Sequence, residues 1–123
     1  EKKFYFGTDE MFLGAAAMGA DGGIGSTYNL IGDIYLAIER AVSTGDIHQA
    51  RSYQSAANNF IAILLEVGVI PGLKHCLNRL GVRVGPSRAP FSPMSSAATA
   101  KLDTWIKQSG IEEHGLLSQA VRS

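Results

Sequence analysis

The sequence predicts an α/β protein that opens with alternating strands and helices and continues as helices alone. Residues 3–7 ("KFYFG") are short, aromatic and apolar and stop at a glycine, and residues 22–26 ("GGIGS") are too short for anything but a tight buried strand. Each is followed by a segment with helical spacing, and after residue 46 the regular patterns are helical. Alternation of strand and helix indicates parallel strands with helices outside.

The two strands are each followed by a predicted helix. Residues 8–19 can begin with a cap at Thr8 or Gly7, place Asp9 and Glu10 in the first turn, and end at a glycine. Residues 30–45 form an amphipathic helix, with one face made of Ile31, Ile34, Tyr35, Ile38 and Val42. Because a parallel sheet must be covered on both faces, two strands suggest the end of a larger sheet.

A longer helix is predicted from Asp46 to about Val67. Asp46 followed by Gln49 resembles a capping box, which satisfies free N–H groups at a helix start. The apolar stripe of this helix consists of Ala50, Tyr53, Ala57, Phe60, Ile61 and Leu64.

Prolines and a serine cap indicate the boundaries of the remaining segments. Pro71 predicts the first position of a helix, where its missing N–H costs nothing, and Gly81 ends that helix. Residues 82–93 contain three prolines and are predicted to be extended, and Ser95 or Ser96 begins a last helix through residue 105. We therefore divide the chain into residues 1–45 (strands and helices), 46–110 (helices) and 111–123 (a tail predicted to fray).

Composition excludes several classes of protein. Hydrophobic residues make up 46%, which is not a disordered composition, and the net charge is zero with the eleven cations scattered. We therefore expect no nucleic acid and no membrane as partner, since both attract clustered Lys and Arg. The apolar runs are too short to cross a bilayer, and no signal peptide is visible. Cys76 stands alone, which favours a reducing compartment, and we expect the cytoplasm.

The glycine-rich stretch at residues 19–29 ("GADGGIGSTYN") raises the question of a phosphate site. A dinucleotide fingerprint through Gly23 and Gly25 would need a third glycine where Tyr28 stands. A P-loop would need lysine where Ser26 stands. Neither motif is present, so a phosphate does not account for these glycines.

The stretch "FYFGTDEMFLGAAAMGADGGIGSTYN" resembles the N-acetylneuraminate lyase family, pyruvate-dependent aldolases related to dihydrodipicolinate synthase. "TGDIHQARSYQ", "GLKHCLNRLGV" and "GPSRAPF" extend the resemblance to about residues 3–108. It implies the last two strand–helix units of a TIM barrel, the seventh and eighth, followed by a C-terminal helical appendix. Since such barrels need about 250 residues, it also implies an absent N-terminal barrel half.

The resemblance implies a substrate site but no catalytic residue in this chain. The substrate-binding positions it implies are Gly7, Asp9, Glu10, Ile24, Gly25 and Ser26, the last three at the end of the second strand. The family's Schiff-base lysine motif does not occur, so we expect this chain alone to be inactive. Sialic acid and pyruvate are the implied small-molecule substrates, without cofactor or metal, and the implied assembly is a homo-oligomer, a tetramer in the family.

Purely structural roles for these residues stay open. Asp9 and Glu10 can simply stabilise a helix dipole, and Ser26 can be a turn or cap serine. His75 has no second ligand at metal spacing, and Cys76 is interpreted as a buried thiol. For the whole chain, the alternatives are another pyruvate-dependent aldolase, such as dihydrodipicolinate synthase, or a non-catalytic helical interaction module.

Overall fold

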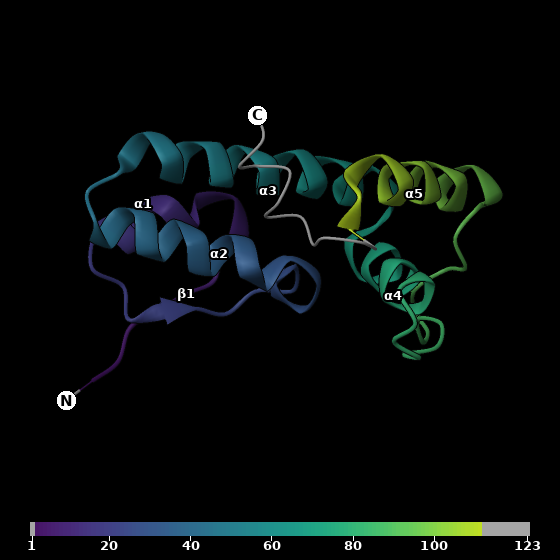
Figure 1. The fold of residues 1–123 in the computed structure, drawn as a ribbon. Helices are drawn as coiled ribbons and strands as arrows, with labels where there is room; N and C mark the ends of the chain where they lie inside the picture. Colours follow the sequence, from purple (N-terminus) through teal and green to yellow (C-terminus); the bar gives the residue numbers. More distant parts are fainter. Residues whose placement is uncertain (1, 112–123) are drawn as a thin grey trace.

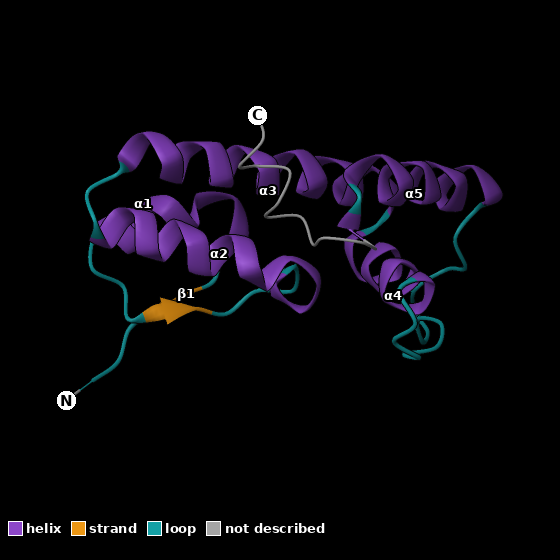
Figure 2. Ribbon diagram, in the orientation of Figure 1, coloured by secondary structure: helices purple, strands orange, loops and turns teal. Residues whose placement is uncertain are grey.

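The computed structural model describes residues 2–111, and it is rich in helix with one small sheet (Figures 1 and 2). The first part of the chain alternates strand and helix, and the elements after residue 46 are all helices, as the sequence predicts. In chain order the elements are β1 (Tyr5–Phe6), the 3-10 helix η1 (Asp9–Met11), α1 (Phe12–Ala17), β2 (Gly22–Gly23), α2 (Tyr28–Ser43), α3 (Ile47–Val67), α4 (Val69–Arg79) and α5 (Ser96–Ser109).

The two strands pair in parallel, which confirms the predicted arrangement. Tyr5 lies opposite Gly22 and Phe6 opposite Gly23. The Ile24 N–H donates to the Phe6 carbonyl at 2.9 Å, so backbone pairing extends one residue beyond β2. Both strands are shorter than predicted, because within the described residues each has a neighbour on one side only.

The helix predicted over residues 8–19 is found as two consecutive elements, the 3-10 helix η1 and α1. Met11, the last residue of η1, has φ −122° and ψ 14°, which is not helical. Thr8 occupies the predicted cap position, but its side chain makes no capping hydrogen bond. The side chain of Asp9, the first residue of η1, is buried.

Helix α2 begins at Tyr28, two residues before the predicted start, and bends at Ile31. Ile31 has φ −123° and ψ 31°, and Gly32 follows it, a residue type often found at helix bends. The predicted apolar face is confirmed: the fully or nearly fully buried members are Ile31, Ile34, Tyr35 and Ile38.

Helix α3 connects the two parts of the structure. Figure 1 shows that its first half lies along α1 and α2 and its second half reaches α4 and α5. The predicted cap is confirmed, since Asp46 Oδ1 accepts from the Gln49 N–H at 2.9 Å. Ala50, Ala57, Phe60 and Leu64 on this helix are fully buried and form the centre of the core.

Helix α4 begins at Val69 rather than at Pro71. Gly68, at φ 98°, turns the chain sharply between α3 and α4, a conformation that favours glycine. Pro71 still lies in the first turn, where N–H groups have no helical partner, so the physical reason for placing a proline there holds.

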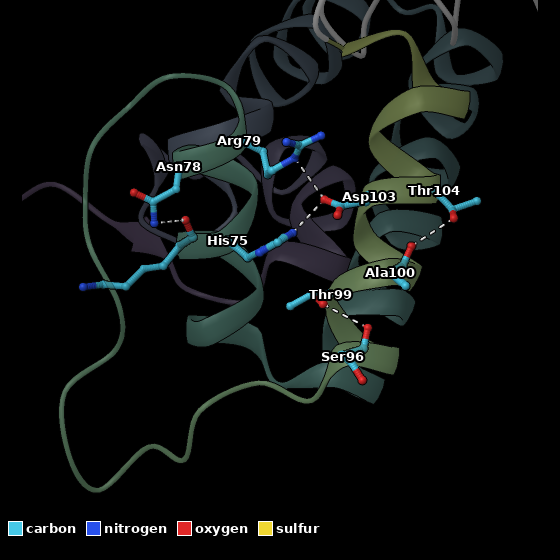
Figure 3. A network of polar contacts seen from close by, with 9 residues as sticks. His75, Asn78, Arg79, Ser96, Thr99, Ala100, Asp103 and Thr104 are labelled. Carbon is cyan, nitrogen blue, oxygen red and sulfur yellow. Dashed lines mark hydrogen bonds and ion pairs between the residues drawn. The ribbon is translucent and has the colours of Figure 1, made fainter.

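Helix α5 packs against α3 and α4. Ser95 is its cap, and its Oγ accepts from the Ala98 N–H at 3.2 Å. The Trp105 ring stacks on Phe60 of α3 with centroids 4.1 Å apart. Asp103 accepts from His75 Nε2 at 2.8 Å and from Arg79 Nε at 3.1 Å (Figure 3). Ile111, at the start of the tail predicted to fray, is buried, and residues 112–123 lie outside the described residues.

Phe60→Ala should destabilise the chain strongly, because it removes a fully buried ring and its stacking on Trp105. A loss of about 3–5 kcal/mol in the free energy of unfolding is expected. Phe91→Ala is the matched control, since Phe91 is 49% exposed. Urea unfolding followed by circular dichroism measures both, and equal losses would contradict the placement of Phe60 in the core.

Asp103→Asn should weaken the contact between α4 and α5 in a pH-dependent way. The hydrogen bond from His75 holds the pKa of Asp103 below its usual value. A lowered carboxyl pKa contributes stability above the unfolded pKa, about 4, and that contribution disappears as the pH falls through the folded pKa. The variant should therefore lose up to about 1 kcal/mol at pH 6 and progressively less as the pH falls below about 4, in urea unfolding with Glu39→Gln as control. A loss that is the same at pH 6 and at pH 3 would contradict this account.

Candidate functional site

A pocket lies beyond the carboxyl ends of β1 and β2. It has a volume of about 200 Å³. Ligand sites of parallel α/β folds lie outside these strand ends. One wall is the backbone and polar side chains that follow each strand, and the other comes from α3 and the start of α4. The lining residues are Gly7, Thr8, Asp9, Glu10, Ser26, Thr27, Ile61, Leu64, Leu65 and Val69.

Asp9 connects the two strand ends through a buried hydrogen-bond network. Its Oδ2 accepts from the Thr27 N–H at 3.1 Å and from the Thr27 hydroxyl at 2.5 Å. The Tyr35 hydroxyl lies 2.7 Å from the Thr27 Oγ1. Because a carboxylate only accepts, Thr27 donates to Asp9 and Tyr35 donates to Thr27. Burial raises the pKa of Tyr35, which keeps its hydroxyl protonated as this direction requires.

The glycines of the second strand make room for this network. A Cβ at Gly25 would stand 1.8 Å from Asp9 Oδ1, and one at Gly23 would stand 2.3 Å from the Tyr28 hydroxyl. Both distances are impossible for a real side chain. The glycine-rich stretch is therefore explained by a carboxylate and a tyrosine packed against bare backbone.

Two side chains of α3 hold the loop after β1 from the other side. Gln54 Nε2 donates to the Asp9 carbonyl at 3.0 Å, while its Oε1 accepts from the Leu13 N–H at 2.9 Å. Asn58 Nδ2 donates to the Glu10 carbonyl at 3.3 Å. Sequence reasoning missed both residues. The available signal was that Gln54 stands one turn after Ala50 on the buried face of an apolar stripe, where a polar side chain requires partners.

The pocket brings together four of the positions named from the sequence, which are Gly7, Asp9, Glu10 and Ser26. Glu10 is exposed, whereas Asp9 is only 7% exposed, so the two acids differ in environment. Gly25 lies behind Asp9, and Ile24 is 69% exposed and outside the lining. Thr27, which lines the pocket and holds Asp9, was not named from the sequence.

Three aromatic rings support the floor of this region. Phe12, Tyr28 and Tyr35 pack together, with centroids 4.0 Å apart for the two tyrosines. Burial, with a further contribution from Asp9, raises the pKa of Tyr28 to about 12. Tyr28 therefore packs in this aromatic cluster.

The other candidates of the sequence lie away from this pocket. Burial, together with the charge of Asp103, raises the pKa of Cys76 to about 12, as suits a buried thiol. Among residues 2–111, no group of three or more His, Cys, Asp and Glu could hold a metal ion. No described helix is by itself long and apolar enough to cross a membrane; α3 and α4 reach that length and hydropathy only together, with a bend of 112°.

Two parallel strand–helix units with a pocket beyond the strand ends are an arrangement that also occurs in α/β barrels. Residues 2–109 match the dihydrodipicolinate synthetase family, and the chain belongs to that family. It is 46% identical to an N-acetylneuraminate lyase of Rhizobium meliloti over 98 residues, covering 80% of this chain and 33% of that protein. An Enterobacter N-acetylneuraminate lyase is 42% identical over 110 residues, covering 89% of this chain and 37% of that protein.

Solved structures agree with this assignment. N-acetylneuraminate lyase from Fusobacterium nucleatum superposes with a TM-score of 0.83 at 32% identity, covering 87% of this chain and 37% of that one. A dihydrodipicolinate synthase from Aquifex aeolicus, at 24% identity and TM-score 0.75, covers 86% of this chain and 36% of that one and shows the shared fold alone. These relatives are TIM-barrel enzymes, and this chain spans about a third of the length of the curated relatives it matches.

Gly25→Ala should destabilise the chain, because the added methyl group overlaps the Asp9 carboxylate. Displacing this buried carboxylate from Thr27 should cost about 1–3 kcal/mol. Gly14→Ala is the matched control: nothing lies within 4 Å of its Cβ position in α1, so it should stabilise by about 0.5–1 kcal/mol. Thermal unfolding measures both variants, and a Gly25→Ala variant as stable as the parent chain would refute the packing described here.

Proposed function

We propose that this chain is the sugar-binding part of a Schiff-base aldolase that cleaves N-acetylneuraminate to N-acetylmannosamine and pyruvate, and that it forms the seventh and eighth units of the barrel with the helical appendix. The observation that carries the proposal is the gathering of Gly7, Asp9, Glu10 and Ser26 around one pocket at the strand ends. The identity to N-acetylneuraminate lyases over most of the chain supports it.

Within this proposal the two acids have different tasks. Glu10 is exposed at the pocket and is the acceptor for sugar hydroxyl groups. Asp9 offers its remaining lone pairs from a fixed position, because Thr27 and Gln54 hold its carboxylate and its backbone. Gly7 and Ser26 complete the polar wall, while Ile24 and Gly25, at the end of the second strand, belong to the pyruvate end.

The bond cleavage itself requires a group that the described residues do not bring to the pocket. A lysine amine must attack the C2 carbonyl of the open-chain sugar, and the resulting protonated imine accepts the electron pair released by C–C cleavage. No lysine lines the pocket. We therefore propose that the chain alone is inactive and that activity needs the remainder of the barrel. The assembly proposed for the parent enzyme is a homo-oligomer.

A chimera tests the function directly. Residues 2–109 replace the matching segment of the Rhizobium meliloti enzyme, and pyruvate release from N-acetylneuraminate is measured for the chimera and for this chain alone. The chimera should release pyruvate and the chain should not. A folded chimera that traps pyruvate with borohydride but does not cleave the sugar would overturn the proposed substrate, and pyruvate release by the chain alone would overturn its inactivity.

Glu10→Gln in the chimera separates sugar binding from stability. A hydrogen bond to a charged group contributes about 1.5–3 kcal/mol, so kcat/KM for N-acetylneuraminate should fall roughly 10- to 100-fold. Borohydride trapping of pyruvate should stay unchanged, because pyruvate has no hydroxyl chain. Glu39→Gln, an exposed acid of α2, is the control. Unchanged sugar kinetics in Glu10→Gln would return Glu10 to a helix-dipole role.

A further inference from the structure

A second cavity, larger than the pocket at the strand ends, lies between α4, the beginning of α5 and the segment that joins them. Its volume is about 470 Å³, within the range of small-molecule sites. It shares no lining residue with the strand-end pocket. Figure 3 shows the joining segment as a wide loop beside α4 and α5. The lining residues used below are Lys74, Asn78, Ser87 and the apolar set Pro71, Pro93 and Met94.

The wall of this cavity is fixed before any ligand arrives. Asn78 Oδ1 accepts from the N–H groups of Val84 and Gly85 at 3.1 and 3.2 Å, and its Nδ2 donates to the Gly85 carbonyl at 3.0 Å. Lys74 Nζ donates to the carbonyls of Val84 and Pro86 at 3.3 and 3.1 Å. These bonds tie the loop to α4, so a ligand meets a preformed site and orders little on binding.

The cavity carries an uncompensated positive charge. Lys74 has three N–H donors, and two of them are used by backbone carbonyls, which carry no net charge. Within residues 2–111 its ammonium makes no ion pair. The nearby carboxylate of Asp103 is taken by His75 and Arg79. The third donor of Lys74 is therefore suited to an anionic acceptor.

Two further features describe the rest of the ligand. The Ser87 hydroxyl is buried and, among the described residues, has no hydrogen-bond partner, a condition that a ligand oxygen would relieve. Pro71, Pro93 and Met94 offer apolar surface along the same cavity. A ligand with an anionic end beside Lys74 and Ser87 and an apolar body against the prolines would match both the polar and the apolar parts of the cavity wall.

We propose that this cavity binds a small organic carboxylate with an apolar body, anchored by Lys74. The site is separate from the strand-end pocket, and it does not depend on the function proposed above. Its carboxylate accepts the third N–H of Lys74, and its hydrocarbon part covers the proline and methionine side chains.

Binding is tested on the full chain by NMR titration of backbone amides. The probe is 4-phenylbutyrate, and 4-phenylbutan-1-ol is its neutral counterpart. The acid should shift the amides of residues 74, 85, 87 and 94 saturably, and the alcohol should bind roughly 10- to 100-fold more weakly, the loss expected for one hydrogen bond to a charged group. Absence of saturable shifts, or shifts confined to residues 7–10 and 26–27, would overturn the proposal.

Lys74→Gln tests the anchor. Glutamine can still donate to the loop carbonyls but carries no charge, so the preference for acid over alcohol should disappear. Arg51→Gln, which removes one exposed positive charge from α3, should leave that preference intact. Equal loss in both variants, or none in Lys74→Gln, would contradict a specific site. If Lys74→Gln does not fold, the test is the affinity of the parent chain for the acid divided by its affinity for the alcohol. A ratio near one would refute the proposal.

Discussion

The rest of the site depends on the hydrogen bonds that the buried carboxylate of Asp9 accepts from Thr27. A carboxylate that loses its water must recover hydrogen bonds inside the protein. Asp9 recovers them from the backbone and hydroxyl of a residue 18 positions later, at the end of the neighbouring strand. The Asp9–Thr27 hydrogen bonds therefore join the ends of the two short strands in addition to the few backbone hydrogen bonds between them. Both residues line the pocket, so these bonds also fix its polar wall.

Helix α3 packs against the segment that carries Asp9. In the middle of this helix Gln54 and Asn58 hold the backbone of the two acids, and Phe60, two residues after Asn58, stacks on the ring of Trp105 from α5. The same helix thus supplies the polar clamp behind the pocket and the apolar core between the appendix helices. The pocket and the second cavity share no lining residue, although α4 contributes Val69 to the first and Pro71 to the second.

Features that follow from local sequence patterns were predictable, and contacts between residues far apart in the sequence were not. The apolar faces of α2 and α3, the Asp46 and Ser95 caps and the parallel strands follow from local spacing, and the structure has them. The helix predicted over residues 8–19 is present as η1 followed directly by α1, but neither its 3-10 first turn nor the contact of Asp9 with Thr27 was predictable from local spacing. Thr27 carries no local signal of its role, since its partner lies 18 residues away. The place of Gln54 on a buried helix face indicates that it needs partners, but it does not identify them, since Asp9 lies 45 residues away.

The overlap between a Cβ at Gly25 and the Asp9 carboxylate has an evolutionary consequence. The two positions share one volume, so neither can change freely while the other is kept. A lineage that enlarges the residue at position 25 must first shorten or lose the acid at position 9, and a lineage that loses the acid is released from the glycine. Substitution at position 25 is therefore conditional on position 9, because the carboxylate makes a larger residue at position 25 deleterious. The pair acts as one inherited character rather than two.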